Sequence, residues 1–109
     1  MVKNAAPMPL ASPKYPFEEW VVKGAPDDPG VYALYSDDVL LCIGVASGRR
    51  GDDHIRARLL AHLKSNARGI THYQWEITLT PVAVRARYLQ TLAMRLPDCE
   101  DFPPAAPGP

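Results

Sequence analysis

Between Gly30 and Leu96 the chain changes from a pattern of apolar residues typical of β-strands to one typical of helices, and back again. Residues 31–35 are rich in β-branched and aromatic side chains, and residues 39–45 form an almost continuous apolar run. A short polar turn joins the two stretches, which predicts an antiparallel β-hairpin. Because the second stretch is apolar throughout, we expect both faces of its strand to be covered.

An amphipathic helix is expected after the hairpin, over about residues 53–65. Apolar side chains recur there at helical spacing, so one face of the helix is expected to pack on the core. Asp52 comes just before this stretch and is expected to cap the first turn, because its carboxylate can accept from free backbone N–H groups. The apolar positions are Ile55, Leu59, Leu60 and Leu63.

A third strand and a last helix complete the pattern. Residues 71–79 alternate strictly between apolar and polar side chains, which predicts a strand with one face on the core and with Glu76 on the other face. Pro81 then opens a helix expected over about residues 81–95, with Thr80 as its cap. The expected core positions of the strand are Tyr73, Trp75, Ile77 and Leu79.

The order of these elements, β-β-α-β-α, predicts an α+β domain with a small three-stranded antiparallel sheet flanked by helices. Proline marks the limits of this domain, because only one of the 12 prolines lies between Gly30 and Leu96. We therefore expect a flexible arm over residues 1–14, a folded domain over 15–102 and a disordered proline-rich tail over 103–109.

Composition narrows the class of protein. The chain has 109 residues, of which 47% are hydrophobic, so it can form one core. Two cysteines exclude a four-cysteine zinc site and a disulfide framework, and we interpret Cys42 as an inert buried thiol. The sequence contains neither a membrane-spanning apolar run nor the apolar stretch of a secretory signal. We therefore expect a cytoplasmic protein with no membrane partner.

Two tripeptides and a helix carry a resemblance to a known family. Gly30-Val31-Tyr32 is followed, after nine intervening residues, by Cys42-Ile43-Gly44, and the next helix contains Ile55-Arg56-Ala57-Arg58-Leu59. In this spacing and element order, the chain resembles the GIY-YIG nuclease domain over roughly residues 28–99.

The resemblance implies a DNA endonuclease that hydrolyses phosphodiester bonds with the help of Mg²⁺ or Mn²⁺. Tyr32 would deprotonate the attacking water or relay its proton, and Arg58 would neutralise the charge on the phosphoryl oxygens. His62, one helical turn after Arg58, would contact the phosphate or the leaving group. Gly44 would let the backbone approach the phosphate, and Gly30 and Cys42 complete the motif positions.

The chain departs from the family pattern at two positions. Cys42 replaces the tyrosine of the second tripeptide, which removes one phenol. Ala86 stands where the metal-binding glutamate of the last helix is expected, with Arg87 in the alternative alignment. No acidic residue occurs between Glu76 and Asp98, so the metal ligands are not identified and catalytic activity itself is left open.

Local charge favours DNA as the partner although the formal net charge is zero. Residues 49–68 carry an excess of four positive charges, as contact with backbone phosphates requires. An inactive domain that only binds DNA is one alternative. A domain that serves a protein partner through its proline-rich termini is another, and the oligomeric state is left open. The expected nucleic-acid contacts are Arg49, Arg50, Arg56, Lys64 and Arg68.

Overall fold

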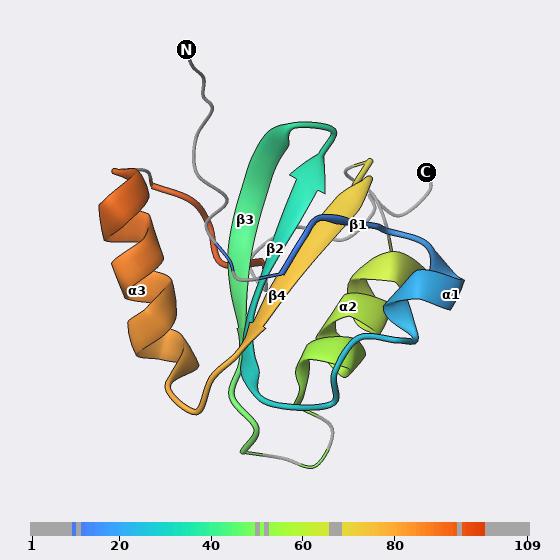
Figure 1. The fold of residues 1–109 in the computed structure, drawn as a ribbon, viewed down its shortest axis with the longest axis horizontal. Helices are drawn as coiled ribbons and strands as arrows, with labels where there is room; N and C mark the ends of the chain where they lie inside the picture. Colours follow the sequence, from blue (N-terminus) through green and yellow to red (C-terminus); the bar gives the residue numbers. More distant parts are fainter. Residues whose placement is uncertain are drawn as a thin grey trace, which may run out of the picture.

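The computed structural model describes residue 10 and residues 12–49, 51, 53–65, 69–93 and 95–99 of the chain. These residues form an antiparallel sheet with helices on both of its faces (Figure 1). The chain order is β1-α1-β2-β3-α2-β4-α3. The strands are β1 (Tyr15–Pro16), β2 (Gly30–Ser36), β3 (Val39–Ala46) and β4 (His72–Ile77), and the helices are α1 (Glu19–Val22), α2 (Ile55–Lys64) and α3 (Pro81–Leu92).

The described sheet has four strands, one more than the sequence predicted, in the spatial order β1-β4-β2-β3. The predicted order β-β-α-β-α holds from β2 to α3, and β1 is the addition at the outer edge of β4. In that added strand Tyr15 pairs with Tyr73, and Pro16 pairs with His72. Two residues are too few to show the alternation of a strand, so the sequence pattern did not predict β1. Proline is tolerated there because an edge strand does not need every backbone N–H for pairing.

Both faces of the sheet are covered, so the domain has three layers (Figure 1). Successive side chains of β2 point to opposite faces, as a strand requires. Tyr32 and Leu34 pack toward α1 and α2, whereas Val31 and Tyr35 pack toward α3. The sheet thus separates two apolar clusters. Alternate residues of β2 belong to the cluster under α1 and α2, and the residues between them belong to the cluster under α3.

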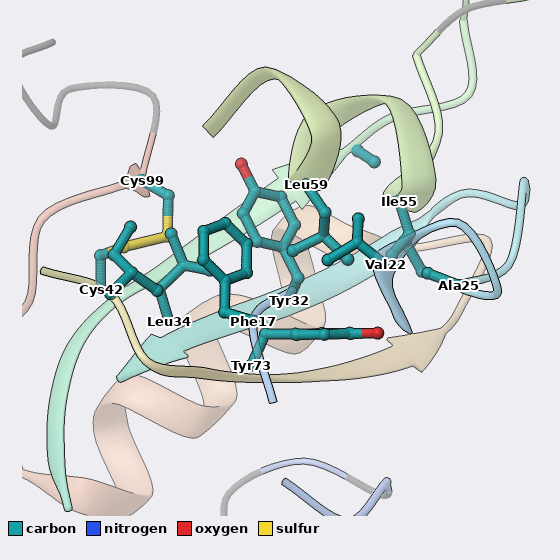
Figure 2. Close-up of a cluster of buried hydrophobic side chains, with 12 residues drawn as sticks. Phe17, Val22, Ala25, Tyr32, Leu34, Cys42, Ile55, Leu59, Tyr73 and Cys99 are labelled. Carbon is teal, nitrogen blue, oxygen red and sulfur yellow. A yellow bond between two sulfur atoms is a disulfide. The ribbon is translucent and has the colours of Figure 1, made fainter. Parts of the chain in front are cut away.

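The larger cluster fills the space between the sheet and the pair α1 and α2 (Figure 2). Ile55 and Leu59, two of the apolar positions expected in the first long helix, are fully buried there. The helix begins at Ile55 and is capped by His54, whose Nδ1 accepts from the backbone N–H of Ala57 at 3.2 Å. The expected cap, Asp52, lies outside the described residues.

The face of β4 that carries the polar side chains is covered as well. Gln74 has no exposed surface, because it lies between β2 and the segment before β1. The Tyr35 hydroxyl donates to its Oε1, and its Nε2 donates to the carbonyl of Ser12 at 2.8 Å. Ser12 also accepts from the backbone N–H of Trp75 at 2.9 Å, so this residue of the expected arm is bound to the domain.

Of the expected core positions in residues 71–79, the earlier ones pack in or against the core and the later ones are exposed. Tyr73 is 1% exposed and Trp75 packs against the larger cluster, as predicted. Ile77 and Leu79 are 49% and 87% exposed, which contradicts their expected burial. β4 ends at Ile77, and the residues beyond it form the connection to α3, which begins at Pro81. Alternation of side chains therefore identifies the strand but not how far the helices cover it.

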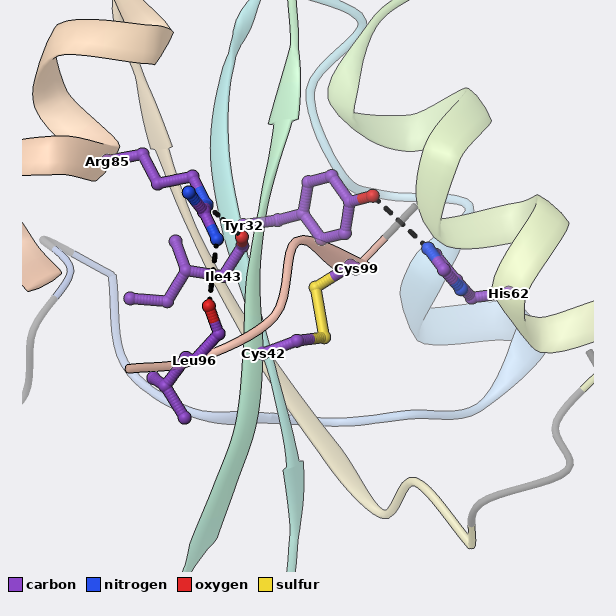
Figure 3. Close-up of a disulfide and its surroundings, with 7 residues drawn as sticks. All are labelled: Tyr32, Cys42, Ile43, His62, Arg85, Leu96 and Cys99. Atoms are coloured by element: carbon purple, nitrogen blue, oxygen red, sulfur yellow. Dashed lines mark hydrogen bonds between the residues drawn. A yellow bond between two sulfur atoms is a disulfide. The ribbon is translucent and has the colours of Figure 1, made fainter. Parts of the chain in front are cut away.

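The segment after α3 forms what we call the C-terminal strap, residues 95–99. Leu96 packs with the cluster under α3, whereas Cys99 is buried in the cluster under α2. The strap therefore passes from one face of the sheet to the other around its β3 edge (Figure 3). There Cys99 forms a disulfide with Cys42 of β3, with the two Cα atoms 5.2 Å apart. This corrects the interpretation of Cys42 as a free thiol.

Arg85 of α3 closes the same edge of the sheet. Its Nε donates to the carbonyl of Ile43 at 2.6 Å, and its Nη2 donates to the carbonyl of Leu96 at 3.1 Å (Figure 3). An edge strand otherwise leaves such carbonyls unpaired. One side chain thus fastens the beginning of the strap to the outer edge of β3, while the disulfide fastens its end.

Candidate active site

Two of the three expected catalytic side chains are in contact. Tyr32 lies in the central strand β2, and its phenol crosses the larger cluster to reach α2. There its Oη and Nε2 of His62 form a hydrogen bond of 3.1 Å (Figure 3). Tyr32 has no exposed surface, whereas His62 is partly exposed. The pair therefore connects the interior of the domain with the surface of α2.

Gly44 makes room for this phenol. It lies directly opposite Tyr32 in the ladder between β2 and β3. A Cβ atom at position 44 would lie 2.6 Å from the Tyr32 Oη and 2.9 Å from the Cβ of Cys99. Side chains of real proteins do not approach so closely, so residue 44 is glycine because the ring and the strap occupy the space. Close packing thus explains the glycine in this structure, and its expected role beside a phosphate stays a prediction.

Gly30 is explained by packing as well. A Cβ atom there would lie 2.7 Å from Cδ1 of Ile55 and would collide with the backbone carbonyl of Glu76. The residue therefore lets β2 approach both β4 and the first turn of α2. The two motif glycines contribute to the site indirectly. Because they have no side chain, Tyr32 fits beside β3 and α2 approaches β2.

Arg58 lies one helical turn before His62 on the same face of α2, and it forms an ion pair with Asp53. Its Nε donates to Oδ1 of Asp53 at 2.8 Å, and only 12% of the Asp53 side chain is exposed. The other carboxylate oxygen accepts from the backbone N–H of Ser47 at 3.1 Å and from the Ser47 hydroxyl. Asp53 thus holds Arg58 against the loop that follows β3.

The charge state of Asp53 follows from these contacts. Burial alone would raise the pKa of Asp53, but hydrogen bonds from Ser47 and Arg58, with the positive charge of Arg58, outweigh it and lower the pKa below its ordinary value. The carboxylate is therefore ionised at neutral pH. Sequence reasoning missed Asp53, although an acidic residue five positions before the key arginine was visible as a signal.

The basic residues expected to bind nucleic acid differ in their surroundings. Arg49 and Lys64 are exposed, as a phosphate contact requires. Arg56 instead donates from Nε to the carbonyl of Ala25 at 2.8 Å, which ties α2 to the segment before β2. Arg50 and Arg68 lie outside the described residues.

The expected Mg²⁺ or Mn²⁺ has no cluster of protein ligands among the described residues. They contain no group of three or more His, Cys, Asp or Glu side chains that could hold a metal ion. Ala86 is exposed on α3, which lies on the face of the sheet opposite Tyr32. Glu76 lies on the face of β4 opposite Tyr73, as predicted, and its carboxylate accepts from the Tyr88 hydroxyl of α3. Burial, followed by this hydrogen bond and the charge of Glu76, raises the pKa of Tyr88 to about 12.

In comparison with known proteins, no family model, no curated protein and no solved structure matches this chain. Within the part of the chain that the structure describes, no helix has the length and apolarity needed to cross a membrane. The chemistry of the site therefore has to be argued from its own side chains.

The pair Tyr32–His62 can move a proton in either direction. A phenol donates to a neutral imidazole nitrogen, or an imidazole N–H donates to the phenol oxygen, so the same hydrogen bond serves as a relay from a buried group to a partly exposed one. Arg58 adds a guanidinium on the same face of the helix, a group suited to phosphoryl oxygens. Such a combination can transfer protons beside a bound anion.

Proposed function

We propose that this domain is a DNA endonuclease of the GIY-YIG type that hydrolyses phosphodiester bonds. The hydrogen bond between Tyr32 and His62, on the helix that carries Arg58, is the observation that supports this function most. It brings a phenol and a base together at the positions that the motif assigns to catalysis.

The proposed reaction uses these three side chains. A water molecule attacks phosphorus as its proton passes to the Tyr32 oxygen, and the phenolic proton passes on to Nε2 of His62. The bond from phosphorus to one ester oxygen breaks, and that oxygen leaves with a proton from solvent. Arg58 balances the negative charge that accumulates on the phosphoryl oxygens. Mg²⁺ or Mn²⁺ remains an expectation from the family resemblance.

A domain that binds DNA without cutting it is the second candidate, and Ala86 favours it. The expected metal-binding glutamate is missing from α3, and the described residues offer no replacement. The exposed Arg49 and Lys64 would suffice for contact with backbone phosphates.

Nicking of supercoiled plasmid tests the first candidate. The protein is incubated with Mg²⁺, with Mn²⁺ and with a chelator, both with the disulfide intact and after reduction. We expect nicking that Tyr32→Phe and Arg58→Ala abolish. Tyr88→Phe is the matched control, because it removes a phenol on the opposite face of the sheet and should leave nicking unchanged.

The same series separates the two candidates. Nicking that survives both substitutions would show that a different site, or a contaminant, cuts the plasmid. Without nicking under any condition, a gel shift that weakens steeply with salt supports the binding domain. An affinity independent of salt would overturn both nucleic-acid functions.

A further inference from the structure

The phenol that the proposed reaction needs is covered by the C-terminal strap. Tyr32 is 0% exposed, so no substrate can touch its hydroxyl in this state. The point where a Gly44 Cβ would stand is 2.6 Å from the Tyr32 Oη and 2.9 Å from the Cys99 Cβ. The last residue of the strap and the phenol are therefore direct neighbours, as Figure 3 shows from the side of the disulfide.

Among the described segments next to the phenol, the strap differs from β2, β3 and α2 because it lacks regular backbone hydrogen bonding. β2 and β3 are joined by an antiparallel ladder with one register shift, between Leu34 and Tyr35, and α2 is a helix of ten residues. Residues 95–98 belong to no helix or strand, and Arg95 and Pro97 are exposed. The Arg85 contact to Leu96 and the disulfide from Cys99 both hold the strap, and Leu96 also packs against the cluster under α3.

We propose that the C-terminal strap is a redox-controlled cover of the Tyr32–His62 site, closed by the Cys42–Cys99 disulfide and released by thiol–disulfide exchange. The inference rests on the proposed function, because opening is useful only if the Tyr32–His62 site must admit a substrate. The oxidised protein keeps the phenol buried, and the dithiol form lets the strap leave the face of the sheet.

The exchange requires a dithiol reductant. Its thiolate attacks one sulfur of the disulfide, the Sγ–Sγ bond breaks, and a mixed disulfide forms with one cysteine while the other becomes a thiol. The second thiol of the reductant then attacks the mixed disulfide, which frees the second cysteine. Two electrons and two protons pass to the protein, and the reductant leaves as its own disulfide.

Burial of both cysteines sets the order of events. Each has 0% exposed surface, so the reductant cannot reach a sulfur while the strap is seated. A local opening of residues 95–99 must come first, and reduction then prevents the strap from being fixed again. The pair Tyr32 and His62 belongs to β2 and α2, which the ladder and the buried Ile55 and Leu59 hold in place without the strap.

Chemical labelling of tyrosine tests the proposal without any need for activity. The full chain is treated with N-acetylimidazole in the disulfide form and after reduction with blocking of both thiols, and the labelled tyrosines are identified by peptide mass spectrometry. Tyr73 is the internal reference, because it is buried in the same cluster away from the strap, where its hydroxyl donates to the Val21 carbonyl. We expect labelling of Tyr32 relative to Tyr73 to rise about tenfold on reduction.

Three outcomes decide the matter. A selective rise at Tyr32, repeated in the variant with Cys42→Ser and Cys99→Ser, supports the cover. Continued protection of Tyr32 after both thiols have been titrated overturns it. A parallel rise at Tyr32 and Tyr73 also overturns it, because the disulfide would then hold the whole domain together.

The labelling result is independent of the proposed function. If Tyr32 opens selectively but the reduced protein neither nicks plasmid nor binds DNA, the cover stands and the nuclease assignment fails. If the reduced protein nicks plasmid while Tyr32 stays protected, the cover fails and the nuclease assignment stands.

Discussion

Gly44 and Tyr32 face each other across the β2–β3 ladder, and the phenol ring fills the space that a side chain at position 44 would need. This relationship explains two motif positions at once. The glycine leaves room for the ring beside β3, and the hydroxyl reaches His62 on α2. A change at either position should therefore disturb the other.

Gly44→Ala should destabilise the domain by about 1–3 kcal/mol, since the new methyl group must displace the ring or the strap. Urea denaturation measures the free energy of unfolding. Gly51→Ala is the control, because a Cβ at that exposed glycine would meet no atom within 4 Å. Equal effects of the two substitutions would contradict the packing argument.

The hydrogen bond between Tyr32 and His62 should appear as a coupling between the two residues. In a double-mutant cycle with Tyr32→Phe and His62→Phe, we expect a coupling free energy of about 1 kcal/mol. The cycle is measured by thermal or urea unfolding, with Tyr88→Phe replacing Tyr32→Phe as the uncoupled control. Strict additivity of the first pair would show that the bond does not form in solution.

Asp53 should make stability depend on pH. Its pKa is lowered in the folded state, so its contribution is present above the unfolded pKa, near 4, and is lost as pH falls through the lower folded pKa. We expect Asp53→Asn to reduce stability at pH 7 by about 2 kcal/mol, since Ser47 and Arg58 both bond to the carboxylate. The difference from the native protein should shrink on acidification.

Asp38→Asn is the control for this pH dependence. Asp38 forms an ion pair with Lys14 at 3.4 Å, but its side chain is fully exposed. Exposed pairs contribute little, so the unfolding curves of this variant and the native protein should coincide at every pH. A pH profile shared by Asp38→Asn and Asp53→Asn would contradict the assignment of the effect to Asp53.

Much of the fold is visible in the sequence because it depends on local periodicity. The hairpin of β2 and β3 and the helices α2 and α3 lie where apolar spacing places them. β1 was missed because two residues carry no period. The burial of Gln74 was missed for another reason, since alternation marks one face of β4 as polar while Tyr35 and Ser12 satisfy its amide on the inside.

The site was predicted less completely, because its contacts join distant parts of the chain. Tyr32 and His62 were both named, and they do meet. The disulfide joins residues 57 positions apart, and nothing in their spacing shows that the chain after α3 turns around the edge of the sheet. The sequence pattern did not single out Arg85, although its side chain bonds to two backbone carbonyls at that edge.

Arg85→Met should loosen the strap while keeping most of the aliphatic side chain. The carbonyls of Ile43 and Leu96 would lose their donor, so residues 95–99 should open more often and the disulfide should be reduced several times faster by a dithiol. Thiol titration against time measures the rate. Arg87→Met, at an exposed position of the same helix, should leave the rate unchanged.

The buried amide of Gln74 also determines how far the chain can be shortened. Its Nε2 hydrogen bonds to the carbonyl of Ser12, which precedes the first strand and belongs to no helix or strand itself. A protein trimmed to begin at Tyr15 would retain every strand and helix that the structure describes and still leave this amide without its acceptor. Fragment boundaries for expression or crystallisation should therefore lie upstream of Ser12.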